Sequence, residues 1–190
     1  MNLVPTPSQT VGPYLHLGLT DGRSVGCLAG AEAKGERVRL ICQVLDGDGA
    51  PVPDAMIELW QANAEGKYYH PEDTQEKALD PAFRGFGRMP TAADGTCTFE
   101  TIKPGRVPHP GGNLQAPHLN ISILARGLLK RLATRLYFLE EPANLEDPIL
   151  ALVPAARQDT LMARLAPGQP SAWRWEIHLC GEHETVFFDV

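Results

Sequence analysis

Short runs in which apolar and polar residues alternate recur along this chain, and glycine or proline turns separate them. The clearest run forms one apolar stripe, made of Trp173, Trp175, Ile177 and Leu179. Another, residues 37–45, ends in Asp46-Gly47-Asp48-Gly49, a strong turn signal. Because a side-chain period of two belongs to extended chain, these runs predict strands. We expect strands at residues 37–45, 55–60, 96–102, 119–125, 134–139, 173–180 and 185–188.

The composition also favours strands and turns over long helices. Gly (18) and Pro (17) are abundant, whereas aromatic residues make up only 7% of the 190 residues. The Asp-Gly turns near residues 46–49 and 94–95 predict two hairpin-like units, and one helix is expected from Pro154 to about Leu165. We therefore predict an all-β chain with an irregular N-terminal arm over residues 1–36, a β-sandwich domain over residues 37–190 and one late short helix.

Charge, hydropathy and cysteine content exclude several classes of protein. The 17 basic residues are scattered among 23 acidic ones, and the net charge of −6 argues against a nucleic-acid partner. The longest apolar run, residues 149–153, is far shorter than the roughly 20 residues that span a bilayer. Residues 1–10 lack a signal-peptide pattern, so a cytoplasmic location is expected. The cysteines are expected to be reduced and mostly buried; they are Cys27, Cys42, Cys97 and Cys180.

Two familiar catalytic patterns find no support in the sequence. The run Arg84-Gly85-Phe86-Gly87-Arg88 lacks the strand-to-helix context of a phosphate loop, so we interpret it as a turn with two solvated arginines. No Gly-x-Ser-x-Gly elbow occurs, which leaves a nucleophile triad without support.

Phenol and imidazole side chains gather after the first predicted turn. Tyr68, Tyr69 and His70 are consecutive, and His109 and His118 follow. These donor types suit ferric iron, and two ligands at positions i and i+2 of a strand share one face. The same residue types are also typical of packed side chains on half-buried strands. From the residues alone, both interpretations stay open.

Several motifs occur together and in order between residues 37 and 140. They are Leu45-Asp46-Gly47-Asp48-Gly49, Pro53-Asp54-Ala55, Glu58-Leu59-Trp60-Gln61-Ala62-Asn63, Gly66-Lys67-Tyr68, Phe86-Gly87-Arg88, Thr101-Ile102-Lys103-Pro104-Gly105 and Leu136-Tyr137-Phe138. In this order they resemble the intradiol ring-cleaving dioxygenases. Catechol-cleaving members carry a large helical region before this domain, whereas here the first core strand starts near Arg37. The resemblance therefore points to two-chain members, in which both chains have the intradiol type of β-sandwich.

In the iron-bearing chain of such enzymes, two tyrosines and two histidines hold ferric iron, and the resemblance places each position. The first tyrosine matches Tyr68, and the second falls on Val107. The His-x-His pair falls on His118 and Asn120, and an arginine that stabilises charge on the substrate falls on Gln115. Valine and a carboxamide are poor ligands for ferric iron. The resemblance thus implies a vestigial site, no metal in this chain and no activity of this chain alone.

Two alternatives remain for this vestigial site. Tyr69, His70 or His109 would rescue metal binding if the geometry brought one of them to the missing positions. Otherwise Tyr68 and His118 are inherited side chains that pack in a filled pocket, which we favour over a second substrate site.

Residues 6–14 resemble the arm of the metal-free chain in two-chain members. Thr10, Gly12 and Pro13 match positions that line the partner's active site, and Arg126 matches an arginine that reaches the same pocket. The resemblance implies a hetero-oligomer with an iron-bearing homologue, the beta subunit, which holds Fe(III) and converts protocatechuate and O2 to 3-carboxy-cis,cis-muconate. A turn that tethers the arm to its own sandwich and a solvated Arg126 are the ordinary alternatives. A non-catalytic binding or scaffold protein that kept the sandwich is the alternative for the whole chain.

Overall fold

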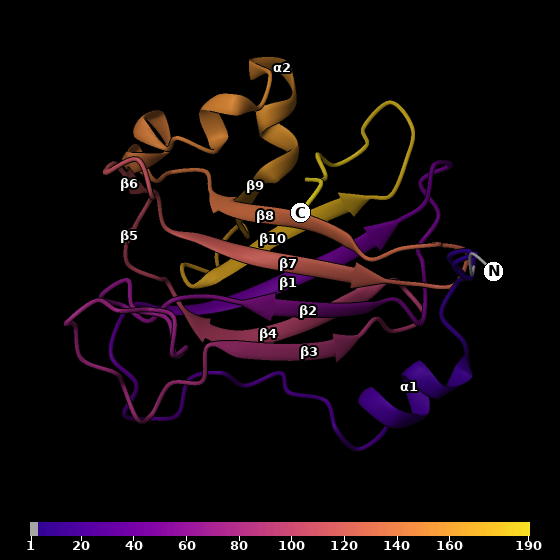
Figure 1. Ribbon diagram of the computed structural model, residues 1–190, viewed down its shortest axis with the longest axis horizontal. Helices are drawn as coiled ribbons and strands as arrows, with labels where there is room; N and C mark the ends of the chain where they lie inside the picture. The colour runs from indigo at the N-terminus through magenta and orange to yellow at the C-terminus, as the bar shows by residue number, and fades with distance from the viewer. Residues whose placement is uncertain (1–3) are drawn as a thin grey trace.

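The computed structural model describes residues 4–190 and has an all-β fold (Figure 1). Eight strands form one sheet in the order β3-β2-β7-β8-β9-β10-β1-β4, and β5 and β6 form a separate ribbon. Residues 1–3 of the predicted arm lie outside the described residues. The elements are α1 (Pro13–Leu19), β1 (Arg37–Leu45), β2 (Met56–Trp60), β3 (Phe86–Pro90), β4 (Thr96–Ile102), β5 (Val107–Pro108), β6 (Leu114–Gln115), β7 (His118–Leu124), β8 (Leu132–Phe138), η1 (Pro142–Glu146), η2 (Leu150–Leu152), α2 (Ala155–Gln158), η3 (Asp159–Leu161), β9 (Met162–Leu165) and β10 (Ala172–His178).

The sheet folds on itself at β9 into two layers that enclose the core. β9 pairs in parallel with β8 through Met162 and Tyr137, and antiparallel with β10 through Leu165 and Trp173. The layer β3-β2-β7-β8 therefore faces β10-β1-β4 across an apolar interior. Alternate residues of the strands point inward, among them Leu40, Ile57, Leu59, Phe99, Ile121, Phe138 and Trp173. The prediction of an all-β sandwich is confirmed.

Residues 25–30 close the open side of this sandwich between the edge strands β3 and β4. Val25 forms a bridge with Arg88 of β3, and Cys27 forms one with Glu100 of β4. Leu28 donates its N–H to the Glu100 carbonyl at 2.8 Å, and its side chain is buried in the core. Because unpaired strand edges invite association with other chains, this segment satisfies backbone groups that would otherwise be exposed.

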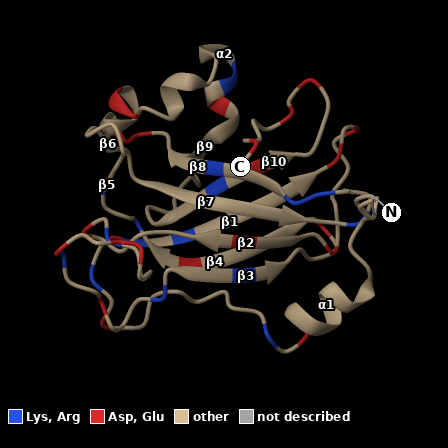
Figure 2. Cartoon of the chain, in the orientation of Figure 1, with Lys and Arg blue, Asp and Glu red and all other residues tan. Residues whose placement is uncertain are grey.

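Charged residues of both signs are interspersed over the loops and the outer faces of the strands (Figure 2). No helix within residues 4–190 combines the length and apolar character needed to cross a membrane.

The two Asp-Gly turns do not join neighbouring strands of the sheet, which corrects the prediction of two hairpin-like units. The first leads from β1 to β2, yet β1 pairs with β4 and β10, whereas β2 pairs with β3 and β7. The second leads from β3 to β4, which also lie in different layers. After the first turn one antiparallel bridge forms, between Leu45 and Pro51, and Val52 donates its N–H to the Val44 carbonyl at 2.9 Å. Pro53 has no N–H to extend this pairing, and the chain passes to the other layer.

The predicted late helix is mostly wrong. Only residues 155–158 are α-helical, and after the short turn η3 the chain becomes strand β9. The apolar spacing of Leu161, Met162 and Leu165 fits a helix locally, but backbone pairing of β9 with both neighbouring strands overrides this preference. Residues 185–188 make one bridge, between Phe188 and Ala133, instead of a strand. The short helix α1 in the arm was not predicted.

Two smaller expectations also need correction. All four cysteines are free, but only Cys42 and Cys97 are buried, because Cys27 and Cys180 lie on exposed loop segments. The run of residues 84–88 was predicted to be a turn, but residues 86–88 belong to strand β3. Arg84 is exposed as expected, whereas Arg88 is half-buried and forms a 2.5 Å ion pair with Glu58.

Candidate functional site

The outer face of the β3-β2-β7-β8 layer carries residues that the resemblance assigns to a metal site. Trp60, Asn120 and Arg135 are direct cross-strand neighbours on β2, β7 and β8. The Tyr68 ring stacks on Trp60 with 5.9 Å between ring centres and 13° between planes. Asn120 Nδ2 donates to the Tyr68 hydroxyl at 3.1 Å. The fold thus joins Tyr68 and Asn120, which lie 52 residues apart in the chain.

Val107 and Gln115 join this cluster from the β5–β6 ribbon. They are cross-strand partners, and Gln115 Nε2 donates to the Pro108 carbonyl at 3.0 Å. A cavity of about 540 Å³ opens between this ribbon and the loop that carries Tyr68. We call it the Tyr68 cavity and define it by Trp60, Tyr68, His70, Val107, His109 and Gln115.

The loop after β2 fixes the position of Tyr68 through its own side chains. Asn63 Oδ1 accepts the backbone N–H groups of Glu65 and Lys67, each at 3.0 Å. Asp73 Oδ2 accepts the Tyr68 N–H at 2.7 Å. These asparagine and aspartate side chains replace backbone partners in a tight turn, which explains the motif around Asn63 and Gly66-Lys67-Tyr68.

A second polar group lies deeper, behind the Tyr68 cavity. His118 is 3% exposed, and its Nδ1 lies 2.7 Å from the Ala116 carbonyl. Its ring packs against Tyr137, whose hydroxyl donates to Asp147 Oδ1 at 3.2 Å. Because a carbonyl only accepts hydrogen bonds, Nδ1 of His118 carries the proton.

The environment holds both His118 and Tyr68 in their neutral forms. Burial, assisted by the Arg135 charge, lowers the pKa of His118 from 6.5 to about 4. Burial also raises the pKa of the Tyr68 phenol above its ordinary value, although Asn120 and Arg135 act in the opposite direction. Near neutral pH the phenol therefore keeps its proton and the imidazole is uncharged.

These residues do not fit a ferric ion. Val107 has no donor atom, and Asn120 presents an N–H group, not a lone pair, to the Tyr68 oxygen. The Tyr68 phenol is protonated, whereas ferric iron takes the phenolate. The Arg135 guanidinium adds a positive charge at the same place. A hard cation would meet an incomplete donor set and a like charge.

Of the side chains considered for a rescue, Tyr69 faces away, whereas His70 and His109 line the Tyr68 cavity with one ring nitrogen bound to the local backbone. Tyr69 is 71% exposed and does not line the Tyr68 cavity. His70 Nδ1 accepts the N–H of Glu72 at 3.2 Å, and His109 Nδ1 accepts the N–H of Gly111 at 3.1 Å. Over residues 4–190, no three His, Cys, Asp or Glu side chains are grouped closely enough to hold a metal.

The lowered pKa of His118 predicts a loss of stability in mild acid. The unfolded chain binds a proton near pH 6.5 and the folded chain only near pH 4, so stability is complete above pH 6.5 and falls towards pH 4. The loss is about 3 kcal/mol at about 1.4 kcal/mol per pKa unit. Denaturant unfolding measured from pH 7.5 to 4 checks this, with His118→Gln as the comparison. A slope of equal size in that variant would assign the loss to other groups.

The N-terminal arm forms a second cluster, next to the end of β7. Thr10 Oγ1 accepts the Gly127 N–H at 2.8 Å and lies 3.5 Å from the Ala125 carbonyl. These two bonds bracket Arg126, which therefore lies beside the arm. Arg126 is exposed, and its Nη2 is 3.4 Å from Asp54 Oδ2. We call Thr10, Gly12, Pro13, Asp54 and Arg126 the arm patch.

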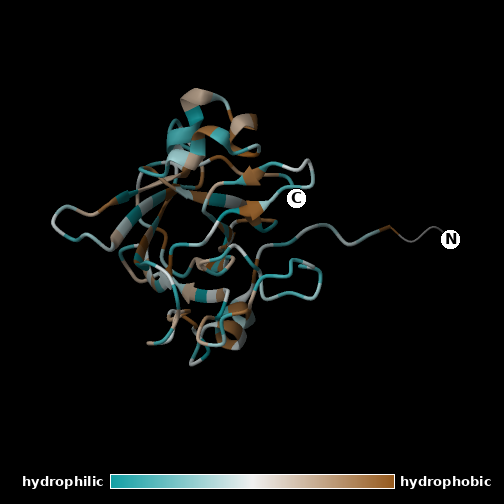
Figure 3. Ribbon diagram, turned by 90° about the vertical axis from the view of Figure 1, so that its left-hand side faces the viewer, coloured by the Kyte–Doolittle hydropathy of each residue, from teal (hydrophilic) through white to brown (hydrophobic). Residues whose placement is uncertain are grey.

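Gly12 and Pro13 lead from Thr10 into the helix α1. Gly12 has an extended backbone (φ −99°, ψ 179°), and Pro13 starts the helix. A Cβ on Gly12 would meet nothing within 4 Å, so this chain itself does not require a glycine there. Residues 4–10 are exposed and leave the sandwich, as Figure 3 shows. Tyr14 and Leu17 of α1 are 83% and 57% exposed. The arm thus presents apolar side chains that its own sandwich does not cover.

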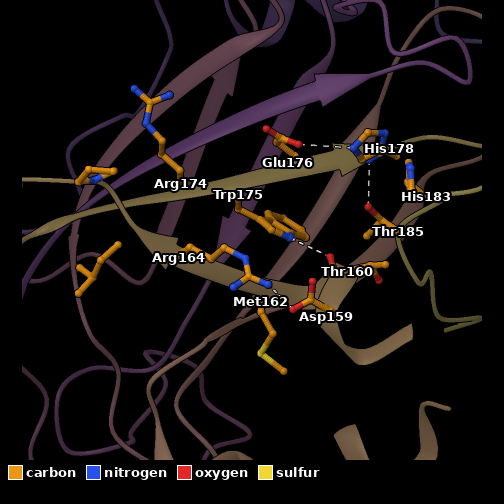
Figure 4. A pocket seen from close by; sticks show the side chains of 12 residues that line it. Asp159, Thr160, Met162, Arg164, Arg174, Trp175, Glu176, His178, His183 and Thr185 are labelled. Carbon is orange, nitrogen blue, oxygen red and sulfur yellow. Dashed lines mark hydrogen bonds and ion pairs between the residues drawn. The ribbon is translucent and has the colours of Figure 1, made fainter. Parts of the chain in front are cut away.

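A second cavity, of about 450 Å³, lies outside β9 and β10 (Figure 4). Several of its polar side chains are paired with one another, although Arg174 and His183 also line it. Arg164 bonds to Asp159, and His178 Nε2 lies 3.7 Å from Glu176 Oε2. Trp175 donates its indole N–H to the Thr160 carbonyl at 3.0 Å. Because most of these groups already bind one another, few remain for a ligand, and we assign this cavity no function.

Sequence reasoning did not single out Arg135 and Asp147, which complete the polar group behind the Tyr68 cavity. Arg135 Nη1 donates to Gln115 Oε1 at 2.7 Å. Asp147 is 1% exposed and accepts the Ala116 N–H at 2.6 Å. The alternation along the predicted strand 134–139 places Arg135 and Tyr137 on one face, and this pattern could have identified Arg135.

Comparison with known proteins agrees with this fold. The family described as Dioxygenase matches residues 11–181. Because the match spans most of the chain, the chain belongs to this dioxygenase family. The resemblance seen in the motifs is confirmed.

Comparison with individual proteins is more specific than the family match. The chain is 42% identical to the protocatechuate 3,4-dioxygenase alpha chain of Burkholderia cepacia, over 99% of this chain and 98% of the relative. It is 38% identical to the beta chain of the same organism, over 81% of this chain and 68% of the relative. The solved dioxygenase domain of a dioxygenase carbohydrate-binding protein fusion from Streptomyces sp. SirexAA-E is 26% identical, with a TM-score of 0.61, over 94% of this chain and 99% of that one.

Proposed function

We propose that this chain is the metal-free alpha subunit of a two-chain intradiol dioxygenase. The complex cleaves protocatechuate with O2 between the two hydroxylated carbons, and both oxygen atoms enter the product, 3-carboxy-cis,cis-muconate. Fe(III) belongs to the homologous beta subunit. The observation that carries the proposal is the similarity to alpha chains along almost the whole length, at 42% identity. The residues at the four assigned ligand positions support it, because Val107 and Asn120 cannot complete an iron site with Tyr68 and His118.

In this proposal the arm patch is the part of the chain that reaches the partner's active site. Arg126 supplies a positive charge for the substrate carboxylate, since a guanidinium offers a fixed fork of donors. Gly12 lets backbone approach the substrate closely, which agrees with the empty space around its Cα. The exposed Tyr14 and Leu17 provide apolar area for the contact between subunits.

Coexpression with iron-bearing beta homologues tests this function. We expect a stable hetero-oligomer by size analysis, iron in the complex, and O2 uptake that depends on protocatechuate. The alternative of a binding or scaffold protein predicts no complex with a beta homologue and no O2 uptake by any mixture.

The isolated chain is expected to be colourless and to contain no stoichiometric iron. The tyrosinate-to-iron charge transfer that colours such centres requires a phenolate ligand, and the Tyr68 phenol keeps its proton in an incomplete donor set. Metal analysis and a visible spectrum after incubation with ferric citrate check this. A coloured preparation with one iron per chain would revive a rescue by Tyr69, His70 or His109.

A further inference from the structure

Arg126 lies in a tight turn just after strand β7. Leu128 donates its N–H to the Ala125 carbonyl at 3.3 Å, so residues 125–128 form a β-turn with Arg126 and Gly127 at its centre. Gly127 has φ +92°, whereas Arg126 is not among the residues with a positive φ. These two signs define a type II turn, whose third position favours glycine. We call residues 125–128 the Arg126 turn.

The Arg126 turn does not by itself fix the peptide between Arg126 and Gly127. A type I turn brings the same ends together with this peptide flipped over and with negative φ at both central residues. Glycine adopts either sign of φ about equally readily, so Gly127 does not oppose the flip. The hydrogen bond that closes the turn does not use the N–H of this peptide, which belongs to Gly127. A partner outside the turn is needed to hold the peptide in one orientation.

Thr10 of the N-terminal arm is this partner. Its Oγ1 accepts the Gly127 N–H at 2.8 Å and donates to the Ala125 carbonyl at 3.5 Å, which is a long hydrogen bond. The two backbone groups lie on either side of Arg126. The hydroxyl proton and one lone pair of Thr10 are therefore engaged with the backbone of its own chain.

The contact of the Arg126 side chain does not set its direction. Its Nη2 lies 3.4 Å from Asp54 Oδ2, and both side chains are more than half exposed. Such pairs contribute little, because water and salt screen them. The direction in which this long side chain leaves the surface therefore depends on the backbone of the Arg126 turn, which Thr10 holds.

We infer that Thr10 is a positioning residue, which holds the Arg126 turn in the type II conformation that presents the guanidinium to the substrate carboxylate. The inference rests on the function proposed above and assigns Thr10 a specific part in it. The hydroxyl acts through Arg126 and not on the substrate. The position of the arm is thereby coupled to substrate binding, since an arm that leaves the turn also releases the Gly127 peptide.

Steady-state kinetics of the assembled complex test this role. Thr10→Val has nearly the same shape as threonine and removes both hydrogen bonds. We expect it to raise the Michaelis constant for protocatechuate about 2- to 10-fold, the factor that loss of one net hydrogen bond carries, with kcat, iron content and complex size unchanged. Thr10→Ser keeps the hydroxyl and should restore the wild-type value. Thr6→Val makes the same change at another exposed threonine of the arm and should have no effect.

A double-mutant cycle separates positioning from direct contact with the substrate. In the Arg126→Ala background no guanidinium is left to position, so Thr10→Val should add nothing to the Michaelis constant. A rise that adds to that of Arg126→Ala would mean that Thr10 acts on the substrate itself, and would overturn the inference. An active complex in which Thr10→Val alone leaves the Michaelis constant unchanged would overturn it as well, while the proposed function would stand.

Amide hydrogen exchange in the isolated chain tests the contact without any beta subunit. Because Thr10 is the acceptor for the Gly127 N–H, Thr10→Val should speed exchange at Gly127 several-fold, and Thr10→Ser should not. Equal exchange in the wild type and in Thr10→Val would refute the hold on the turn. A wild-type chain that forms no active complex would refute the proposed function and the substrate role of Thr10 with it, whereas faster exchange in Thr10→Val would still support the hold on the turn.

Discussion

Replacing Arg126 with alanine in the assembled complex is expected to raise the Michaelis constant for protocatechuate by about 30-fold to several thousand-fold. Loss of one desolvated, charge-assisted contact costs about 2 to 5 kcal/mol, and about 1.4 kcal/mol corresponds to a factor of ten. Among residues 4–190 of the free chain, Arg126 pairs only with Asp54, at 3.4 Å and on an exposed surface. Such a pair is weak, so the guanidinium is free to bind a substrate carboxylate instead. Steady-state O2 uptake measures the effect.

The controls for this variant test charge and geometry separately. Arg126→Lys keeps the charge without the fork of donors and should lose part of the affinity. Arg131→Ala removes another exposed arginine nearby and should leave the kinetics unchanged. Iron content and complex size should be unaltered in all three variants. Unchanged kinetics in a fully assembled Arg126→Ala complex would return Arg126 to a surface role beside Asp54.

The strands with both a clean alternation and a flanking turn were predicted best. β1 and β4 have the predicted bounds, because their apolar faces and Asp-Gly turns are local signals. Their partners were not predicted, since β1 pairs with β10 from the other end of the chain. The strand β9 was taken for helix because its four residues are too few to show a period of two. Pairing between distant segments is a tertiary property that a local pattern does not contain.

In the candidate site, too, single residues were predicted from the sequence but their neighbours in space were not. The motifs located Tyr68, Val107, Asn120 and Gln115 one at a time; in the structure Tyr68, Val107 and Gln115 line one cavity, and Asn120 bonds to the Tyr68 hydroxyl. Arg135 was missed because alternation identifies the face of a strand and not the neighbours across it. Likewise, the resemblance assigned Thr10 and Arg126 separately, whereas their proximity follows from the Thr10 bond to Gly127.

Gly66→Ala is expected to destabilise the chain by about 4 kcal/mol, because the loop that positions Tyr68 has no room for a side chain there. Gly66 has φ +79°, a left-handed conformation that costs a non-glycine residue about 1 to 3 kcal/mol. A Cβ would also lie 2.0 Å from the Arg106 carbonyl oxygen, which belongs to the backbone and cannot rotate away. Relief requires a shift of the segment that leads into Val107, and overpacking of this kind costs about 1 to 3 kcal/mol more.

Gly49→Ala is the matched control for this prediction. Gly49 has nearly the same conformation, with φ +78°, but a Cβ there would meet nothing within 4 Å. It therefore carries the same conformational cost alone, about 1 to 3 kcal/mol. Denaturant unfolding of both variants gives the two free energies, and their difference isolates the contact between Gly66 and Arg106. Equal losses would mean that the two loops separate easily, and that the position of Tyr68 does not depend on their close approach.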